Sequence, residues 1–334
     1  MNTEVLSELL GIPKLPAYLK QVEKILENIL ISDHSSLLEP SLRIVKNSGK
    51  RLRPFLVIAA VLVQDNDISE DTLQACAAIE LVHIGTIVHD DIIDNADIRW
   101  GAPTINKKEG MNQALLVGDY LLALAAAQAT TISKEIGYTI ANTIAIMCDG
   151  QSQETVDEYN VNRSIASYNE VINKKTAALT AAACRIGAIS ANFSESQTAA
   201  VTIYGESFGM SFQLIDDLLD LLATSKAMGK PVGNDIKEGI YTFPILFALQ
   251  SPEKDRARSW LGNHTSAKPD RSTIMETLKN AGAIDATLKE IRRHNEIASK
   301  TIEGLGANKV IKGMSKLPDI YLDWAIKKFP SRIR

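Results

Sequence analysis

Several long segments of this chain are apolar on most faces of a helix. The segments Ser69–Asp94, Ala114–Ile132 and Ser194–Ala223 are rich in Ala, Leu and Ile and contain no proline. A helix that is apolar on most faces must be buried among other helices, and no alternating strand pattern competes with this periodicity. The sequence therefore predicts an all-α protein, a large helical bundle of one domain spanning residues 1–334, with a central cavity.

The remaining chain is also mostly helical in pattern. Helices are predicted over Leu15–Ile31, Leu52–Val63, Gly137–Gln151, Ser167–Ile189 and Ile284–Ile302. Irregular structure is predicted over Asn95–Gly110 and Thr224–Gly239, which each hold Gly and Pro, and over the polar segment Gly262–Asp270. The first two of these segments each follow closely after a cluster of aspartates.

Charge and cysteine content exclude several classes of protein. The net charge of -4 argues against a nucleic-acid or anionic-membrane partner. Cys76, Cys148 and Cys184 form no CxxC pair, so we expect buried free thiols and neither a disulfide framework nor a zinc site. The N-terminal segment has no signal-peptide pattern, and no apolar run reaches the roughly 18 residues of a transmembrane helix. We predict a soluble, cytoplasmic protein.

The first candidate site is a cluster of three aspartates at the end of an apolar helix. Asp90, Asp91 and Asp94 lie in VHDDIID, where Asp90 and Asp94 are one helical turn apart on one face. Carboxylates packed this closely repel one another unless a hard divalent cation lies between them. The alternative is a solvated acidic face, which the apolar sequence leading into the cluster disfavours.

A second cluster repeats the DDxxD pattern inside another apolar helix. Asp216, Asp217 and Asp220 lie in LIDDLLD. Mg²⁺ binds through one or two carboxylates plus phosphate oxygens, and it neutralises phosphate charge as a diphosphate departs. Two such clusters facing each other predict a site for Mg²⁺, about three ions, around a diphosphate.

A basic segment precedes the helix predicted to begin at Leu52. The sequence GKRLRP (49–54) places three cations at or before this helix start. Helix N-termini favour phosphate, and arginine forks match phosphate oxygens. Alone, this is an ordinary basic loop. Beside two acidic metal sites, it predicts a second anion site that needs no metal.

These motifs together resemble the trans-isoprenyl diphosphate synthases, or polyprenyl synthetase family. The resemblance runs from about Gly49 to Pro244. Its landmarks are SGKRLRP (48–54), ELVHIGTIVHDDIIDNADIR (80–99), GDYLLA (118–123), KTAAL (175–179), YGESFGMSFQLIDDLLD (204–220) and GKPVGNDIKEG (229–239). It implies a prenyl transferase that condenses an allylic diphosphate with isopentenyl diphosphate to make a linear trans-polyprenyl diphosphate.

The resemblance also implies a role for each matching residue. The metal-binding motifs are Asp90, Asp91 and Asp94, and Asp216, Asp217 and Asp220. Isopentenyl diphosphate would bind to Lys50, Arg53 and His83, and the allylic diphosphate to Arg99, Lys175 and Lys230. Thr176 and Gln213 match polar residues that line the reaction centre. His89 is predicted to be structural.

The sequence departs from the family pattern at four positions. Trp100 follows Arg99 where many members have a second arginine, Ser48 replaces a common glycine, and Asn234 and Ile240 stand where lysine is common. Each lost cation is expected to weaken diphosphate binding. Both DDxxD motifs are complete, which favours an active enzyme over a non-catalytic subunit.

Three alternatives remain to be weighed. A terpene cyclase shares the bundle and one DDxxD motif, but lacks the basic GKRLRP site. A di-iron bundle needs two ExxH motifs, and only Glu80–His83 matches. A subunit of a heteromeric polyprenyl diphosphate synthase stays open because of Trp100.

Product length is predicted from the residues that precede the first aspartate motif. Gly85 and Thr86 lie roughly 7 Å of helix before Asp90 and Asp91. Short-chain members of the family often carry an aromatic residue there, so an open position favours a long product, above about twenty carbons and roughly thirty to forty by resemblance. This length suits a quinone side chain; a short-chain synthase of about fifteen to twenty carbons is the alternative. The alanines at 123 and 125–127 are expected to keep the opposite wall open, with ordinary close packing of helices as the alternative.

The apolar segment Ala114–Ile132 offers more small and aliphatic surface than one cavity wall needs. Symmetric pairing is the commonest form of assembly, and the resemblance implies the same. We therefore predict a homodimer, with a heterodimer as the alternative.

Overall fold

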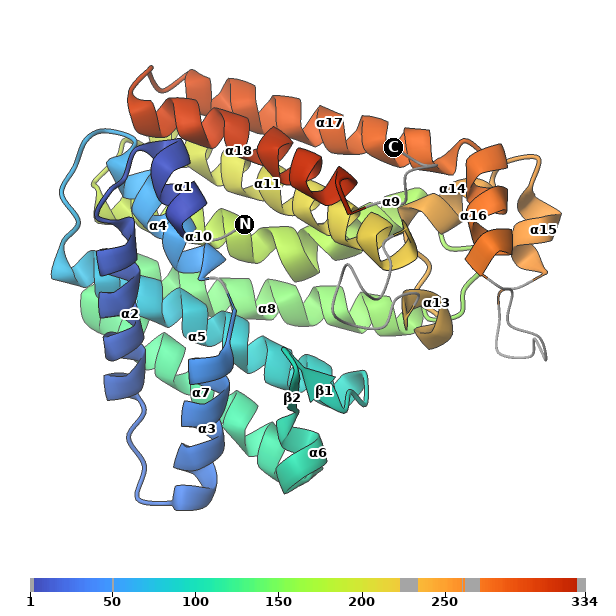
Figure 1. The fold of residues 1–334 in the computed structure, drawn as a ribbon. Coiled ribbons are helices and arrows are strands. Elements are labelled where there is room, and N and C mark those ends of the chain that lie inside the picture. The colour runs from blue at the N-terminus through green and yellow to red at the C-terminus, as the bar shows by residue number, and fades with distance from the viewer. Residues whose placement is uncertain (1–2, 50, 223–233, 260, 262–270, 329–334) are drawn as a thin grey trace. The chain divides into compact units, whose positions relative to one another are not determined.

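The computed structural model describes residues 3–49, 51–222, 234–259, 261 and 271–328 (Figure 1). The helices of its first part are α1 Thr3–Leu10, α2 Leu15–Ile29, α3 Ser35–Asn47, α4 Leu52–Leu62, α5 Glu70–Ile93, α6 Ile105–Glu109, α7 Met111–Ile132 and α8 Lys134–Val156. They are followed by α9 Ile165–Ile172, the π-helix η1 Asn173–Ala177, α10 Ala178–Ser190, α11 Glu195–Leu222, α13 Asn234–Glu238, α14 Phe243–Leu249, α15 Lys254–Arg258, α16 Arg271–Asn280, α17 Ala283–Glu303 and α18 Lys309–Ile326. Among the described residues, the strands are β1 Ile98–Arg99 and β2 Ala102–Pro103, so the all-α prediction is confirmed.

The chain divides into two compact units. The first comprises Met1–Ala145, Leu179–Gly205 and Thr301–Met314. The second comprises Ile146–Ala178, Glu206–Lys300 and Ser315–Arg334. The first aspartate motif belongs to the first unit and the second motif to the second unit. That residues 1–334 form one domain stays a prediction.

The core of the first unit is built around α5. Helices α7, α4 and α2 pack against it (Figure 1), and α4 is buried on every face from Pro54 to Val61. Ser69 caps the start of α5, because its side-chain oxygen accepts a hydrogen bond from the backbone N–H of Thr72 at 3.1 Å. Such a cap stabilises a helix by about 1 kcal/mol, and it fixes the helix start that the sequence predicts.

Glycines let α5 and α7 approach closely. A Cβ on Gly118 would overlap the imidazole of His89, whose Nε2 lies 3.3 Å from the backbone oxygen of Leu115. A Cβ on Gly85 would lie 3.0 Å from Cγ of Leu122 and 3.2 Å from the backbone oxygen of Gly118. His89 therefore has a packing role, as predicted. Leu122 of α7 fills the space beside Gly85, and the role of Gly85 and Thr86 in product length stays a prediction.

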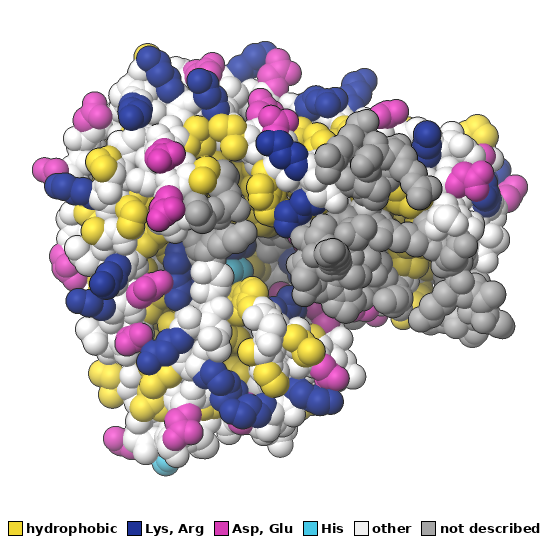
Figure 2. Space-filling view, in the orientation of Figure 1, with side chains coloured by type: hydrophobic (Ala, Val, Ile, Leu, Met, Phe, Trp, Pro, Cys, Tyr) yellow, Lys and Arg dark blue, Asp and Glu magenta, His cyan; other side chains and the backbone are white. Residues whose placement is uncertain are grey.

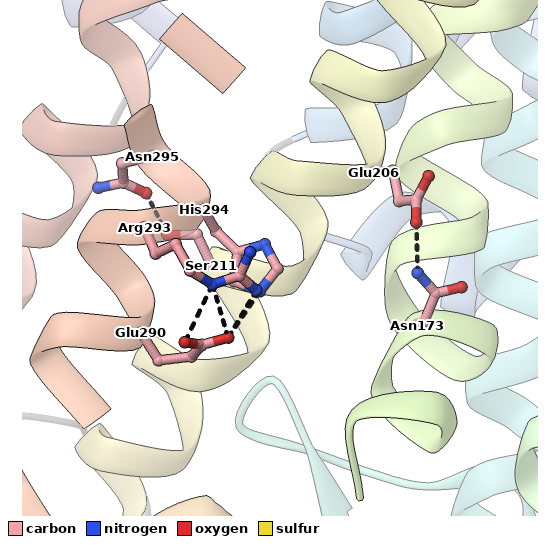
Figure 3. Close-up of polar contacts among 7 residues, drawn as sticks. All are labelled: Asn173, Glu206, Ser211, Glu290, Arg293, His294 and Asn295. Atoms are coloured by element: carbon pink, nitrogen blue, oxygen red, sulfur yellow. Dashed lines mark hydrogen bonds and ion pairs between the residues drawn. The ribbon is translucent and has the colours of Figure 1, made fainter. Parts of the chain in front are cut away.

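The predicted helix Ser167–Ile189 contains a π-turn. Asn173–Ala177 form a π-helix between α9 and α10, and such turns are frequent at functional sites. Gly150 of α8 accommodates the widened turn, since a Cβ there would lie 2.8 Å from Cβ of Lys174 and 2.9 Å from the backbone N of Lys175. Asn173 donates a 2.6 Å hydrogen bond to Glu206 of α11 (Figure 3).

The parts of α11 and α17 that lie in the second unit are joined by a buried polar contact. Ser211 of α11 donates to Asn295 of α17 (Figure 3), and Asn295 donates to Asp319 at 2.8 Å. Next to it on α17, burial and the charge of Arg293 lower the pKa of His294 to about 4, so this imidazole is neutral at neutral pH. The hydrogen bonds among Ser211, Asn295 and Asp319 satisfy polar groups that would otherwise be costly to bury.

One further sequence prediction needs correction. Cys148 is exposed, while Cys76 and Cys184 are buried as predicted. Among the described residues, α7 is long and apolar enough to cross a membrane by length and composition, although Asp119 interrupts its apolar sequence.

Charged side chains of both signs are mixed on the surface. Figure 2 shows Lys and Arg interspersed with Asp and Glu over the described residues of one face. An anionic ligand would therefore depend on local cations or bound metal ions and not on the overall charge.

Candidate active site

The first aspartate motif lies at the end of α5, and Arg99 of the following hairpin pairs with it. Asp91 is buried, and its Oδ1 accepts from Nε of Arg99 at 2.8 Å and from Nη2 at 2.7 Å. Its Oδ2 is buried and has no hydrogen-bond partner. Burial raises the pKa of Asp91, although the Arg99 charge opposes the shift. A cation next to Asp90 and Asp91 would satisfy the unpaired oxygen.

A tight turn directs Arg99 back toward Asp91. Trp100 and Gly101 form the two-residue loop between β1 and β2, and both have positive φ, 49° and 79°. Positive φ at both positions is the requirement of a type I′ hairpin turn, which rarely accepts a bulky residue. Trp100 therefore occupies a strained position beside the residue assigned to the allylic diphosphate.

The residues assigned to isopentenyl diphosphate meet in the first unit. Nη1 of Arg53 lies 3.1 Å from Nε2 of His83. Burial, reinforced by the charge of Arg53, holds the pKa of His83 well below its usual value. Because a guanidinium only donates, the neutral imidazole accepts from Arg53 and orients it. Lys50, the third member of this set, lies outside the described residues.

Arg51, the middle cation of GKRLRP, belongs to the scaffold. It adopts a left-handed conformation (φ 54°) at the start of α4, and its side chain is buried. Nη1 donates to Oε1 of Glu80 at 3.1 Å, Nη2 donates to the backbone oxygen of Val45 at 2.8 Å, and Nη1 also contacts Ser48. Removing one partner of such a buried pair typically costs about 3–5 kcal/mol. The sequence predicted that all three cations of GKRLRP serve an anion site; Arg51 instead pairs with groups of the protein itself.

The second unit brings Thr176, Gln213 and Asp217 together. Oγ1 of Thr176 donates to Oε1 of Gln213 at 2.8 Å, and Nε2 of Gln213 donates to Oδ1 of Asp217 at 2.8 Å. The hydroxyl of Tyr168 donates to Oδ2 of the same carboxylate. Sequence reasoning missed Tyr168, because a buried tyrosine outside every motif carries no signal of its own.

Negative charge accumulates around this carboxylate. Burial, with the charges of Asp216 and Glu154, raises the pKa of Asp217 to about 7, although its two hydrogen bonds oppose the shift. Burial and neighbouring aspartates also raise the pKa of Asp235, whose backbone N–H lies 3.5 Å from Oδ2 of Asp220. Buried acids of this kind are relieved by a cation.

The two lysines of the π-turn point to different partners. Lys174 is half-buried and pairs with Asp149 at 2.6 Å and with Glu170 at 2.7 Å. Lys175 pairs with Glu154, a more buried acid that sequence reasoning also missed. The π-turn thus separates adjacent lysines and places Lys175 beside the acid that also acts on Asp217. Lys230 lies outside the described residues, as does most of the segment Thr224–Gly239.

The acidic groups suit a metal that takes few protein ligands. In the part of the chain that the structure describes, no three His, Cys, Asp or Glu side chains are placed to hold a metal ion by themselves. Mg²⁺ commonly binds through one or two carboxylates and completes its octahedron with phosphate oxygens and water. The unpaired oxygen of Asp91 and the raised pKa of Asp217 fit such sparse ligation.

Comparison with known proteins places the chain in a family. The family model "Polyprenyl synthetase" matches residues 34–278. Heptaprenyl diphosphate synthase component 2 of Bacillus subtilis is 35% identical over 268 residues, covering 80% of this chain and 76% of that protein. A short chain isoprenyl diphosphate synthase of Methanocaldococcus jannaschii is 34% identical over 269 residues, covering 78% and 81%.

A solved structure of a relative has a similar fold. The polyprenyl synthase from Caulobacter crescentus CB15, complexed with calcium and isoprenyl diphosphate, has a TM-score of 0.86 and 28% identity, covering 97% of this chain and 98% of that one. The fold and the sequence thus define a prenyl transferase. The chain belongs to the polyprenyl synthetase family, which confirms the resemblance inferred from its motifs.

Proposed function

We propose that this prenyl transferase condenses an allylic diphosphate with isopentenyl diphosphate and makes a long linear trans-polyprenyl diphosphate. The observation that carries the proposal is the Asp217 carboxylate, buried in an acidic cluster and held by Tyr168 and Gln213. Such a group has little use in a packed core but suits a metal-bound diphosphate. The heptaprenyl relative supports a long product, and the short-chain relative keeps the alternative open.

The two substrate diphosphates are held by different sets of residues in this proposal. Arg53 and His83, with Lys50, hold the diphosphate of isopentenyl diphosphate, and Arg99 and Lys175 hold that of the allylic substrate. The allylic C–O bond breaks and its electron pair leaves with the diphosphate. The isopentenyl double bond attacks the allylic carbon, and the departed diphosphate takes the proton lost when the new double bond forms.

Mg²⁺ is the proposed cofactor, with the aspartates of the two DDxxD motifs as its ligands. The Caulobacter relative was solved with calcium, another divalent cation. When bound, Mg²⁺ would neutralise phosphate charge and stabilise the departing diphosphate. Asp91 would bind it through Oδ2, the oxygen that Arg99 leaves without a hydrogen-bond partner.

Replacing Arg53 tests the isopentenyl site. Arg53→Ala is expected to raise the KM for isopentenyl diphosphate about tenfold or more, with a smaller change for the allylic substrate, because a charge-assisted phosphate contact is lost. The assay measures incorporation of labelled isopentenyl diphosphate. Arg185→Ala is the matched control, since Arg185 forms an exposed pair with Glu135 at 2.9 Å in the same unit. Equal effects on both substrates would show that the sites are misassigned.

A heteromeric enzyme is the second candidate, because the Bacillus relative is named as a component. The purified chain should make product by itself with Mg²⁺ and an allylic starter. Product that forms only after a second protein is added would favour the heteromeric form instead.

A homodimer is proposed through α7 and α8. Leu115 and Leu116 on α7 are 51% and 56% exposed, Met111 precedes them at 61%, and Tyr138 on α8 is 70% exposed. Large apolar side chains gathered on one helix mark an interaction surface. Leu115→Glu with Leu116→Glu is expected to convert a dimer to a monomer in sedimentation at micromolar concentration, whereas Ile203→Glu, at another exposed apolar position, should not. A parent protein that sediments as a monomer would refute the dimer.

A further inference from the structure

We propose that Tyr168 is a positioning residue for the second aspartate motif, acting through Asp217. Its hydroxyl donates to Oδ2 of Asp217, and the Gln213 amide donates to Oδ1 of the same carboxylate. The carboxylate then presents its remaining lone pairs to a cation in one orientation. This inference rests on the proposed role of Asp216, Asp217 and Asp220 as metal ligands.

The hydrogen bonds leave Asp217 only one arrangement. A tyrosine hydroxyl can donate one proton, and here it goes to Oδ2. The Gln213 amide could point either way, but the Thr176 hydroxyl donates to its Oε1 and so fixes Nε2 toward Oδ1 of Asp217. The chain of donors therefore runs from the π-turn through Gln213 to the carboxylate, and Tyr168 closes it from the other side.

The Tyr168 ring is itself held firmly. It is 2% exposed, and the Phe243 ring packs against it edge-on with centroids 6.2 Å apart. The guanidinium of Arg163 lies over the Tyr168 ring, 5.7 Å from its centroid. Arg163 is held in turn by Asp157, whose Oδ2 lies 3.1 Å from its Nε. A ring packed in this way cannot swing, so its hydroxyl stays directed at Asp217.

Tyr168 serves only as a donor. Its hydroxyl is directed at Oδ2 of Asp217, and an ionised carboxylate oxygen can only accept a hydrogen bond. Groups that orient metal ligands in this way typically change metal affinity by about 10–100-fold when they are removed. If Tyr168 only filled the core, replacing it would lower the stability of the fold and leave the dependence on metal unchanged.

The test compares two buried tyrosines. Tyr168→Phe keeps the ring and deletes the donor to Asp217. Tyr204→Phe is the matched control, because Tyr204 is equally buried and its hydroxyl donates to the backbone oxygen of Met314 at 3.0 Å, away from the aspartates. Binding of Mg²⁺ with inorganic pyrophosphate is measured by calorimetry and by the rise in Tm, and the Mg²⁺ concentration for half-maximal rate is measured in the assay.

We expect Tyr168→Phe to weaken Mg²⁺-pyrophosphate binding about tenfold and to raise the half-maximal Mg²⁺ concentration similarly, with the KM for isopentenyl diphosphate unchanged. Tyr204→Phe should lower Tm without either effect. Equal metal binding in the two variants would overturn the proposal. Because the binding readout needs no turnover, a failure of the proposed reaction would appear separately, as absent product with metal binding intact.

A second background shows whether Tyr168 acts through Asp217. In Asp217→Asn, adding Tyr168→Phe should change Mg²⁺-pyrophosphate binding by less than about twofold, since the acceptor carboxylate is already gone. A further tenfold loss in that background would overturn the proposal. If Tyr168→Phe fails to fold, Gln213→Met, which removes the donor to the other oxygen, should weaken metal binding about tenfold; unchanged binding there would contradict the two-sided support of Asp217.

Discussion

Asp90→Ala and Asp216→Ala are each expected to lower kcat by about a thousandfold or more, while the folded state persists. Each change removes one carboxylate from a DDxxD motif, so the proposed Mg²⁺ ion would lose a ligand. Both aspartates are half-buried at the edge of their clusters rather than packed in the core, so a small loss of stability is expected. The measurement is steady-state incorporation of labelled isopentenyl diphosphate with Mg²⁺ at saturation.

The controls separate metal binding from a general effect of losing an acid. Asp67→Ala removes an exposed aspartate from the loop before α5 and should leave kcat unchanged. A chelator should abolish activity of the parent enzyme, and added Mg²⁺ should restore it. Near-normal turnover in either aspartate variant, or full activity in chelator, would refute the metal assignment.

The sequence predicts the structure best where the signal is local. Ser69 and the aspartates at 90–94 mark both ends of α5, and the structure places its helix from Glu70 to Ile93, between these two capping positions. No prediction covers α3 or α18, each of which contains a proline inside the helix, Pro40 and Pro318. In both helices tertiary packing overrides local propensity.

The site was predictable in its residue types but not in its partnerships. The motifs name Asp217, Thr176 and Gln213, yet nothing local connects Tyr168 with Asp217, which lies 49 residues further along the chain. The sequence places Arg51 among the cations of an anion site, whereas in the structure it is buried and pairs with Glu80, 29 residues away. The π-turn depends on Gly150 of a neighbouring helix. Contacts of this kind leave no periodic trace in the sequence.

Product length depends on which face of α5 the growing chain follows, and Thr86 and Gly85 lie on different faces. Thr86 is four residues before Asp90 and therefore shares its face. Gly85 faces α7, where Leu122 and the backbone of Gly118 fill the space beside it. If the hydrocarbon runs from Asp90 toward the start of α5, a bulky side chain at 86 stands in its path, whereas one at 85 is driven between two packed helices.

Thr86→Phe is therefore expected to shorten the product by several isoprene units, to about fifteen or twenty carbons, because residue 86 lies only about 6 Å of helix from the first aspartate. Gly85→Phe is expected to destabilise the fold by about 1–3 kcal/mol through overpacking, with a smaller change in product. Leu122→Ala in the Gly85→Phe background should recover part of that stability, since the space taken by the leucine is returned. Products are sized by chromatography and stability is measured by denaturant unfolding. A parent product of about fifteen carbons, or an unchanged distribution in Thr86→Phe, would show that the chain does not follow this face. A Gly85→Phe variant as stable as the parent that makes only short product would place the path on the α7 side instead.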